Sequence, residues 1–268
     1  MSLCSVSGIV AAHVNFADRA GEFRAAKPFN HIVIDNFFEP QIANGLASEF
    51  PDFNSPIWAE YNNPIEIKKL SNKWDKFPSL TYSVFSYLVS TKFVEHISSL
   101  VDEKLYPDPG LNGGGWHTHR AGGKLNTHLD YSIHPKLGLE RRLNIIVYLQ
   151  PQWRPEYGGE LGLWEAASDG KGPGDLKVQI SCTFNRAVIF DTSQNSWHGL
   201  PEPVRCPQGI NRNSIAAYYL CDPRPGAPDR GKALFAPYGD QSNDPEILEL
   251  IRRRSQVGSA AAVYGDKK

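Results

Sequence analysis

The stretch RLNIIVYLQ, residues 142–150, opens a series of short segments rich in β-branched and aromatic residues. Such residues favour strands, whereas Gly, Pro, Asn and Asp favour the turns between strands. The segments that follow at short intervals, each bounded by turn residues, are GGELGLWE (158–165), DLKVQIS (175–181), RAVIFDT (186–192) and NSIAAYYLCD (213–222). Several short strands at this spacing predict a β-sandwich or barrel of the jelly-roll kind.

The residues before this β-rich region have a different pattern. PFNHIVIDNFFEP (28–40) predicts one strand, and the segments after it, including STKFVEHISSLVDEKL (90–105), place apolar residues at helical spacing. DPEILELIRRR (244–254) predicts a last amphipathic helix, and GSAAAVYGDKK (258–268) a loose tail. We therefore expect an α+β chain with a mainly β core and a single domain, 1–268. Its parts are mainly helical support with one early strand (1–110), the jelly-roll core (111–222), and a C-terminal loop, helix and tail (223–268).

The composition excludes several classes of protein. With 28 Lys and Arg against 29 Asp and Glu, the chain lacks the basic surface that nucleic acid requires. Its four cysteines form no CxxC pair, which argues against a thiolate zinc site or a disulfide framework and favours a reduced, cytoplasmic protein. The N-terminus has no positively charged leader, and no apolar run approaches the roughly 20 residues of a membrane span, so we expect no membrane partner.

The segment GGKLNTHLDYSIHP (122–135) contains the only His-x-Asp of the chain, His128 and Asp130. Residues two apart on a strand point to the same face, so these side chains can converge as half of a 2-His-1-carboxylate iron site. In a chain with eight histidines the pair alone is weak support. The best third ligand is His198, which follows a predicted strand. His117 and His119 in WHTHR form a rival pair, or they line the same cavity.

A second group of residues suits the binding of a dicarboxylate. Arg212 and Ser214 lie two apart on a predicted strand, and Tyr148 closes a neighbouring one. A guanidinium can hold a carboxylate through two parallel hydrogen bonds, and the hydroxyls add further donors. Each of these residues taken singly also has an ordinary structural role, Arg212 as a rim cation and the other two as sheet residues.

The order of these motifs resembles the Fe(II)/2-oxoglutarate-dependent dioxygenases, in particular the prolyl-4-hydroxylase-like branch. The motifs that carry the resemblance are HLD (128–130), YL (148–149), GGEL (158–161), His198 and RNS (212–214), within about Pro28 to Asp222. The resemblance implies a double-stranded β-helix, or jelly roll, with helices packed on it. It also implies catalytic iron ligands at His128, Asp130 and His198, and 2-oxoglutarate binding by Arg212 and Tyr148, with Ser214 beside them.

The implied enzyme is a single-domain hydroxylase that uses Fe(II), 2-oxoglutarate and O2, with ascorbate as a stimulant, and releases succinate and CO2. Halogenating relatives replace the carboxylate ligand with a small residue, so Asp130 predicts hydroxylation, ring closure or desaturation. The substrate is open between a small molecule (an amino acid, a sugar or a natural-product intermediate), which we favour, and a prolyl residue of a protein or peptide. A cupin-like isomerase or binding protein without O2 chemistry is the alternative of another class.

Four further residues are candidates for the substrate pocket: His117, His119, Arg142 and Trp164. His119 falls near a position where relatives carry a pocket-lining tyrosine. Arg142 precedes the strand that ends at Tyr148, where a solvated strand end is the simpler expectation. Trp164 borders the predicted substrate mouth, although packing in the core is the more common role of such a tryptophan.

Overall fold

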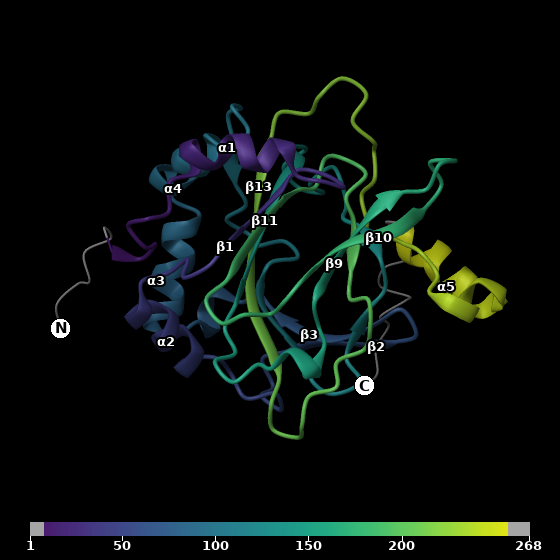
Figure 1. Cartoon of the computed structure of the whole chain (residues 1–268), viewed down its shortest axis with the longest axis horizontal. Helices are drawn as coiled ribbons and strands as arrows, with labels where there is room; N and C mark the ends of the chain where they lie inside the picture. Colours follow the sequence, from purple (N-terminus) through teal and green to yellow (C-terminus); the bar gives the residue numbers. More distant parts are fainter. Residues whose placement is uncertain (1–7, 257–268) are drawn as a thin grey trace.

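The computed structural model describes residues 8–256, so the predicted C-terminal tail lies outside the described residues. Two antiparallel β-sheets form the centre of the molecule (Figure 1). The larger has nine strands, in the order β1 (His31–Ile34), β11 (Ala187–Asp191), β8 (Glu140–Tyr148), β13 (Arg212–Cys221), β5 (Gly115–His119), β3 (Glu66–Ser71) and β2 (Ala59–Asn63), with β4 (Tyr106–Pro107) beside β13 and β6 (Lys124–Leu125) beside β3. The smaller has five, in the order β10 (Pro173–Ile180), β9 (Leu161–Ala166), β12 (Trp197–Gly199), β7 (His128–Leu129) and β14 (Leu234–Phe235).

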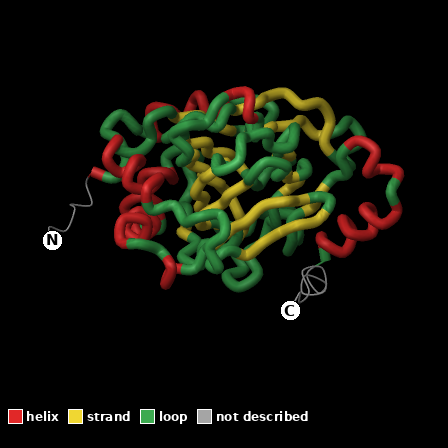
Figure 2. Tube along the Cα trace, turned by 90° about the horizontal axis from the view of Figure 1, so that it is seen from below, coloured by secondary structure: helices red, strands yellow, loops and turns green. Residues whose placement is uncertain are grey.

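Four helices cover one side of the β-sheets and a fifth lies at the opposite end, as both views show (Figures 1 and 2). The five helices are α1 (Phe16–Ala25), α2 (Pro40–Ser48), α3 (Ser79–Leu88), α4 (Thr91–Ser98) and α5 (Pro245–Ser255). Local sequence explains their ends: Asp244, for example, caps α5 by accepting hydrogen bonds from the Glu246 and Ile247 amides. Within residues 8–256 no helix is long and apolar enough to cross a bilayer.

Alternation along the central strand β13 separates the core from the site. On β13, Ile215, Ala217 and Tyr219 pack into the apolar cluster beneath α1–α4. The residues between them, Ser214, Ala216 and Tyr218, line a cavity on the opposite face. Because strand residues alternate between faces, one strand supports the helical layer and shapes the cavity at once.

The predicted jelly-roll fold is confirmed, with helices packed on a mainly β core. The structure differs from expectation in the first 110 residues, where three strands, β2, β3 and β4, accompany the single predicted strand. Charged and polar residues dominate the β2–β3 hairpin, AEYNN and EIKKLS, so it lacks the apolar β-rich signal that identified the other strands.

Gly115 permits the close approach of β5 to β3. Its φ of +90° is in the region that favours glycine, and a Cβ there would collide with the backbone oxygen of Ser71. We expect Gly115→Ala to cost at least about 2 kcal/mol of unfolding free energy, because strain and a backbone clash combine. The matched control is Gly122→Ala, since Gly122 has a φ of +78° but nothing within 4 Å of its Cβ position. Urea unfolding of both variants tests this, and equal losses would contradict the clash.

Candidate metal centre and co-substrate pocket

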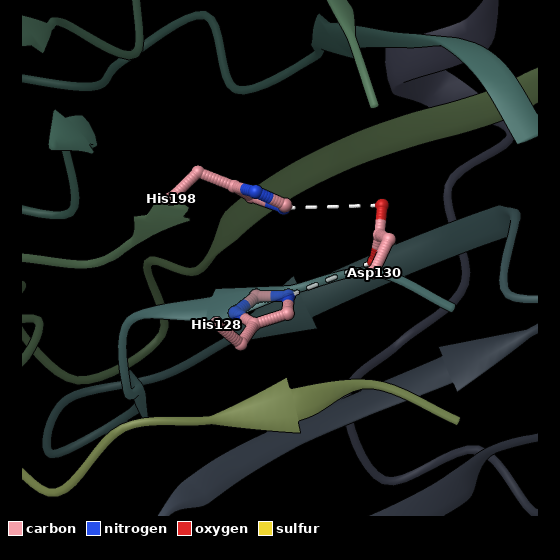
Figure 3. Close-up of side chains that lie close together, drawn as sticks. All are labelled: His128, Asp130 and His198. Atoms are coloured by element: carbon pink, nitrogen blue, oxygen red, sulfur yellow. Dashed lines mark ion pairs between the residues drawn. The ribbon is translucent and has the colours of Figure 1, made fainter. Parts of the chain in front are cut away.

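His128, Asp130 and His198 meet between neighbouring strands of the smaller sheet. His198 on β12 pairs directly with His128 on β7, and Asp130 follows β7 at once. The Asp130 oxygens lie 3.8 Å from His128 Nε2 and 3.9 Å from His198 Nε2 (Figure 3). All three side chains are buried, and their ligand atoms lie within 4.8 Å of one another, so they could hold a metal ion.

Backbone carbonyls set the orientation of both imidazoles. His128 Nδ1 lies 2.9 Å from the Asn126 carbonyl oxygen, and His198 Nδ1 lies 2.8 Å from that of Ser196. A carbonyl can only accept, so in each ring Nδ1 carries the proton and Nε2 keeps its lone pair. Burial lowers the pKa of both rings, which favours the neutral form. This is the state in which a histidine binds a metal through Nε2.

Asp130 presents an ionised carboxylate to the same point. Burial alone would raise its pKa, but the Arg141 guanidinium, 3.4 Å away, and the two histidines hold the pKa at about 2. Among the described residues, Asp130 Oδ2 has no hydrogen-bond partner. A buried anionic oxygen without a hydrogen bond is costly, and a divalent cation would satisfy it. Two neutral imidazoles and one carboxylate are the donor set that suits Fe(II) with open positions.

Arg141, rather than the predicted Arg142, faces this centre. Its guanidinium lies between the rings of Tyr131 and Tyr218, 3.4 Å from each centroid. Arg142 instead binds Asp191 and, at 2.7 Å, Glu103, and it does not line the cavity. Both arginines are buried, so the expectation of a solvated strand end is also wrong.

A β-bulge explains why Arg141, and not Arg142, points into the cavity. Tyr219 pairs with Leu143, but Leu220 pairs with Arg141, so Arg142 is an extra residue in β8. The bulge places Arg141 on the face to which simple alternation would assign Arg142. Bulges redirect side chains in this way near functional sites.

A cavity of about 420 Å³ extends from the three candidate ligands to the residues predicted to bind a dicarboxylate. Cross-strand register brings these residues together on the larger sheet: Arg212 pairs with His119, while Ser214 has His117 on one side and Tyr148 on the other. Arg212, Ser214, His117 and His119 line the cavity, whereas Tyr148 is buried behind Arg212, its ring centroid 5.0 Å from the guanidinium carbon.

The Arg212 guanidinium is held firmly in place. Its Nε lies 2.6 Å from the Gly159 carbonyl oxygen and 3.2 Å from Cys182 Sγ, and its Nη2 lies 3.4 Å from the Tyr148 hydroxyl. An arginine has five N–H donors, so others remain for a carboxylate in the cavity. Gly159 has a φ of +75°, and a Cβ there would press against the Arg212 side chain. The GGEL motif therefore supports the arginine as well as forming a turn.

The other predicted pocket residues divide between cavity and core. His119 is buried, and neither ring nitrogen has a hydrogen-bond partner among the described residues. His117 donates a hydrogen bond from Nε2 to the Gly113 carbonyl oxygen, 3.1 Å away. Trp164 does not line the cavity; it pairs with Trp197 across β9 and β12 and packs in a small apolar cluster. Although Trp164 is only partly buried, its role in packing is the one observed.

Sequence patterns alone missed Arg141, Cys182 and Lys68. Lys68 lies on β3, which belongs to the larger sheet, and its side chain also lines the cavity. The bulge that places Arg141 and the hairpin that carries Lys68 leave no signal of their own in the sequence. Cys182 could have been noted only once its contact with Arg212 was known.

Comparison with known proteins agrees with this geometry. Residues 114–220 match the family model of the 2OG-Fe(II) oxygenase superfamily, and all three candidate metal ligands and Arg212 fall within the match. No curated protein matches the chain in sequence. The expected relation to Fe(II)/2-oxoglutarate-dependent dioxygenases is confirmed, and with it the class of enzyme and its use of iron and 2-oxoglutarate.

Solved structures of prolyl hydroxylases share the fold. A Pseudomonas putida prolyl-4-hydroxylase is 13% identical, with a TM-score of 0.57 over 78% of this chain and 100% of that one. A Trichoplax adhaerens prolyl hydroxylase, in complex with a hypoxia inducible factor fragment, is 15% identical, with a TM-score of 0.54 over 76% of this chain and 90% of that one. A Phytophthora capsici prolyl 4-hydroxylase is 18% identical, with a TM-score of 0.51 over 94% of this chain and 80% of that one.

Burial of the pocket histidines predicts a loss of stability in acid. Burial, followed by the charge of Lys68, lowers the His117 pKa from 6.5 to about 3. The unfolded chain therefore takes up this proton first, and stability falls as the pH decreases below about 6.5. In metal-free protein, His117→Gln should reduce the loss of unfolding free energy between pH 7.0 and pH 5.5 by about 1 kcal/mol. Urea unfolding at both pH values measures this, and an unchanged pH dependence would contradict it.

Proposed function

We propose that this 2OG-Fe(II) oxygenase oxidises an unactivated C–H bond of a small molecule, by hydroxylation, ring closure or desaturation. The observation that carries the proposal is the pair of unprotonated Nε2 atoms, each within 3.9 Å of an oxygen of the Asp130 carboxylate, in a cavity that Arg212 also lines. The superfamily match, which implies O2 chemistry, argues against the cupin-like alternative.

Each side of the site has a separate task in the proposed mechanism. His128, Asp130 and His198 would hold Fe(II), which would supply the activation of O2 coupled to decarboxylation of 2-oxoglutarate to succinate and CO2. Arg141 keeps Asp130 ionised, since its cation offsets the effect of burial on that carboxyl's pKa. The carbonyls of Asn126 and Ser196 hold the two imidazole Nδ1 protons and so keep both Nε2 atoms directed at the metal.

The far end of the pocket binds the co-substrate. Arg212 donates hydrogen bonds to the distal carboxylate of 2-oxoglutarate, and Ser214 adds a hydroxyl from the same face of β13. Tyr148 contributes through Arg212, whose guanidinium it contacts. Leu161, Leu200 and Ile146 line this region and exclude water from it.

The size of the cavity favours a small substrate. At about 420 Å³ it is in the lower part of the range of roughly 300–1,000 Å³ typical of small-molecule sites, and 2-oxoglutarate takes part of that space. The prolyl hydroxylases that share the fold keep peptide hydroxylation as the second candidate, although such distant likeness carries the fold alone.

Oxygenase chemistry has a direct spectroscopic test. Under anaerobic conditions, Fe(II) and 2-oxoglutarate should produce a weak visible charge-transfer band, and admission of air should yield succinate, with stimulation by ascorbate. Asp130→Ala should abolish both signals because the carboxylate ligand is lost. Neither band nor succinate above background in the wild-type protein would refute the proposal.

The division of tasks within the site is tested by Arg212→Ala. Removing one partner of a buried, hydrogen-bonded charge pair should weaken 2-oxoglutarate binding by about 100-fold. Mn(II) affinity, measured by electron paramagnetic resonance, should be unchanged. Arg154→Ala, at an exposed position, is the control and should change neither affinity. Loss of the metal from Arg212→Ala would contradict the assignment.

A further inference from the structure

The β2–β3 hairpin forms a wall of the cavity that the superfamily match does not include, since the match begins at residue 114. Alternation along β3 directs Glu66, Lys68 and Leu70 into the cavity. Lys69 points to the other face, where its ammonium lies 4.3 Å from the centroid of the Phe53 ring. Lys68 provides the positive charge of this wall.

The lining of the cavity carries an excess of positive charge. Among the described lining residues, five side chains are cationic (Lys68, Arg141, Arg212, Lys232 and Arg254) and two are carboxylates (Glu66 and Asp130). Bound Fe(II) and the 2-oxoglutarate dianion would cancel each other, so the excess would persist in the loaded enzyme. Buried charges require compensation, and a bound anion would provide it.

Lys68 is the cation best placed to meet a second anion. Its side chain is 13% exposed, and Glu66, 3.4 Å away, is the only carboxylate within ion-pair distance of it among residues 8–256. Lys68 lines the same cavity as His128, Asp130 and His198, so its ammonium and the candidate metal ligands share one enclosure. Arg212 is committed to the opposite, more enclosed end, and Arg141 to Asp130.

We propose that Lys68 binds a free carboxylate of the substrate, which makes the substrate a small carboxylic acid, such as a free amino acid, rather than a peptidyl residue. This inference rests on the proposed function and deepens it. A peptidyl residue has an uncharged amide where a free acid has its carboxylate, and an ammonium in the cavity that the metal ligands line distinguishes the two by charge. The carboxylate at Lys68 would place the neighbouring carbons of the substrate toward the triad.

The test uses the protein loaded with Mn(II) and 2-oxoglutarate without O2, because Mn(II) accelerates the relaxation of ligand protons near it. Free amino acids, hydroxy acids and short fatty acids are titrated alongside their amides, with an acetylated, amidated prolyl tripeptide as the peptide probe. We expect at least one acid to show relaxation enhancement and to bind at least about 10-fold more tightly than its amide, since the amide lacks the charge.

Three variants connect this preference to Lys68. Lys68→Met should weaken binding of the acid about 10- to 100-fold and leave 2-oxoglutarate affinity unchanged, which also shows that the variant folds. Lys68→Arg, which keeps the charge, should bind the acid within a few-fold of the wild type. Lys69→Met is the matched control, one residue away on the opposite face, and should have no effect.

Several outcomes would overturn the inference. They are equal binding of acids and amides, preference for the peptide probe, no bound acid in the panel, or an unaffected Lys68→Met variant. Weaker 2-oxoglutarate binding in Lys68→Met would assign Lys68 to the co-substrate instead. If Mn(II) fails to relax the protons of 2-oxoglutarate itself, the proposed function fails, so the two failures are distinguishable.

Discussion

The antiparallel pairing of His198 with His128 is the constraint on which the site depends. It brings together two residues that are seventy positions apart and places their ring centroids 4.3 Å apart, with the ring planes tilted by 48°. Phe235 on β14 covers the His128 ring at 5.0 Å, so the smaller sheet fixes the imidazoles from several sides. A shift of one residue in this register would turn one histidine to the opposite face and separate the two Nε2 atoms.

Charge compensation is the second requirement. Asp130 is buried beside a guanidinium that is itself enclosed by two tyrosine rings and bonded through Nη2 to the Asn112 carbonyl oxygen, 2.6 Å away. This arrangement keeps a carboxylate anionic in an enclosed site while leaving Asp130 Oδ2 without a hydrogen bond among the described residues. Arg212 likewise keeps part of its hydrogen-bonding capacity for a ligand. The Gly159 carbonyl oxygen and Cys182 Sγ accept from its Nε, and other N–H groups of the guanidinium remain available.

The sequence predicted those parts of the molecule whose signal is local. Strands rich in β-branched residues, the helical segment within residues 90–105 and the His-x-Asp motif each carry their own pattern, and the resemblance connected His128 with the distant His198. The polar β2–β3 hairpin has no such pattern, because its inner face lines a cavity instead of packing in the core. Arg141 could not be chosen over Arg142, because a bulge in the β8–β13 pairing reverses the alternation there.

The most direct test of the central claim is a crystal structure of the protein with Mn(II) and 2-oxoglutarate, grown without O2. We expect the metal to be bound by His128 Nε2, His198 Nε2 and an oxygen of Asp130, together with one end of 2-oxoglutarate, and the distal carboxylate to contact Arg212. A metal bound instead through His117 and His119, or a co-substrate whose distal carboxylate lies on Lys68, would contradict this account.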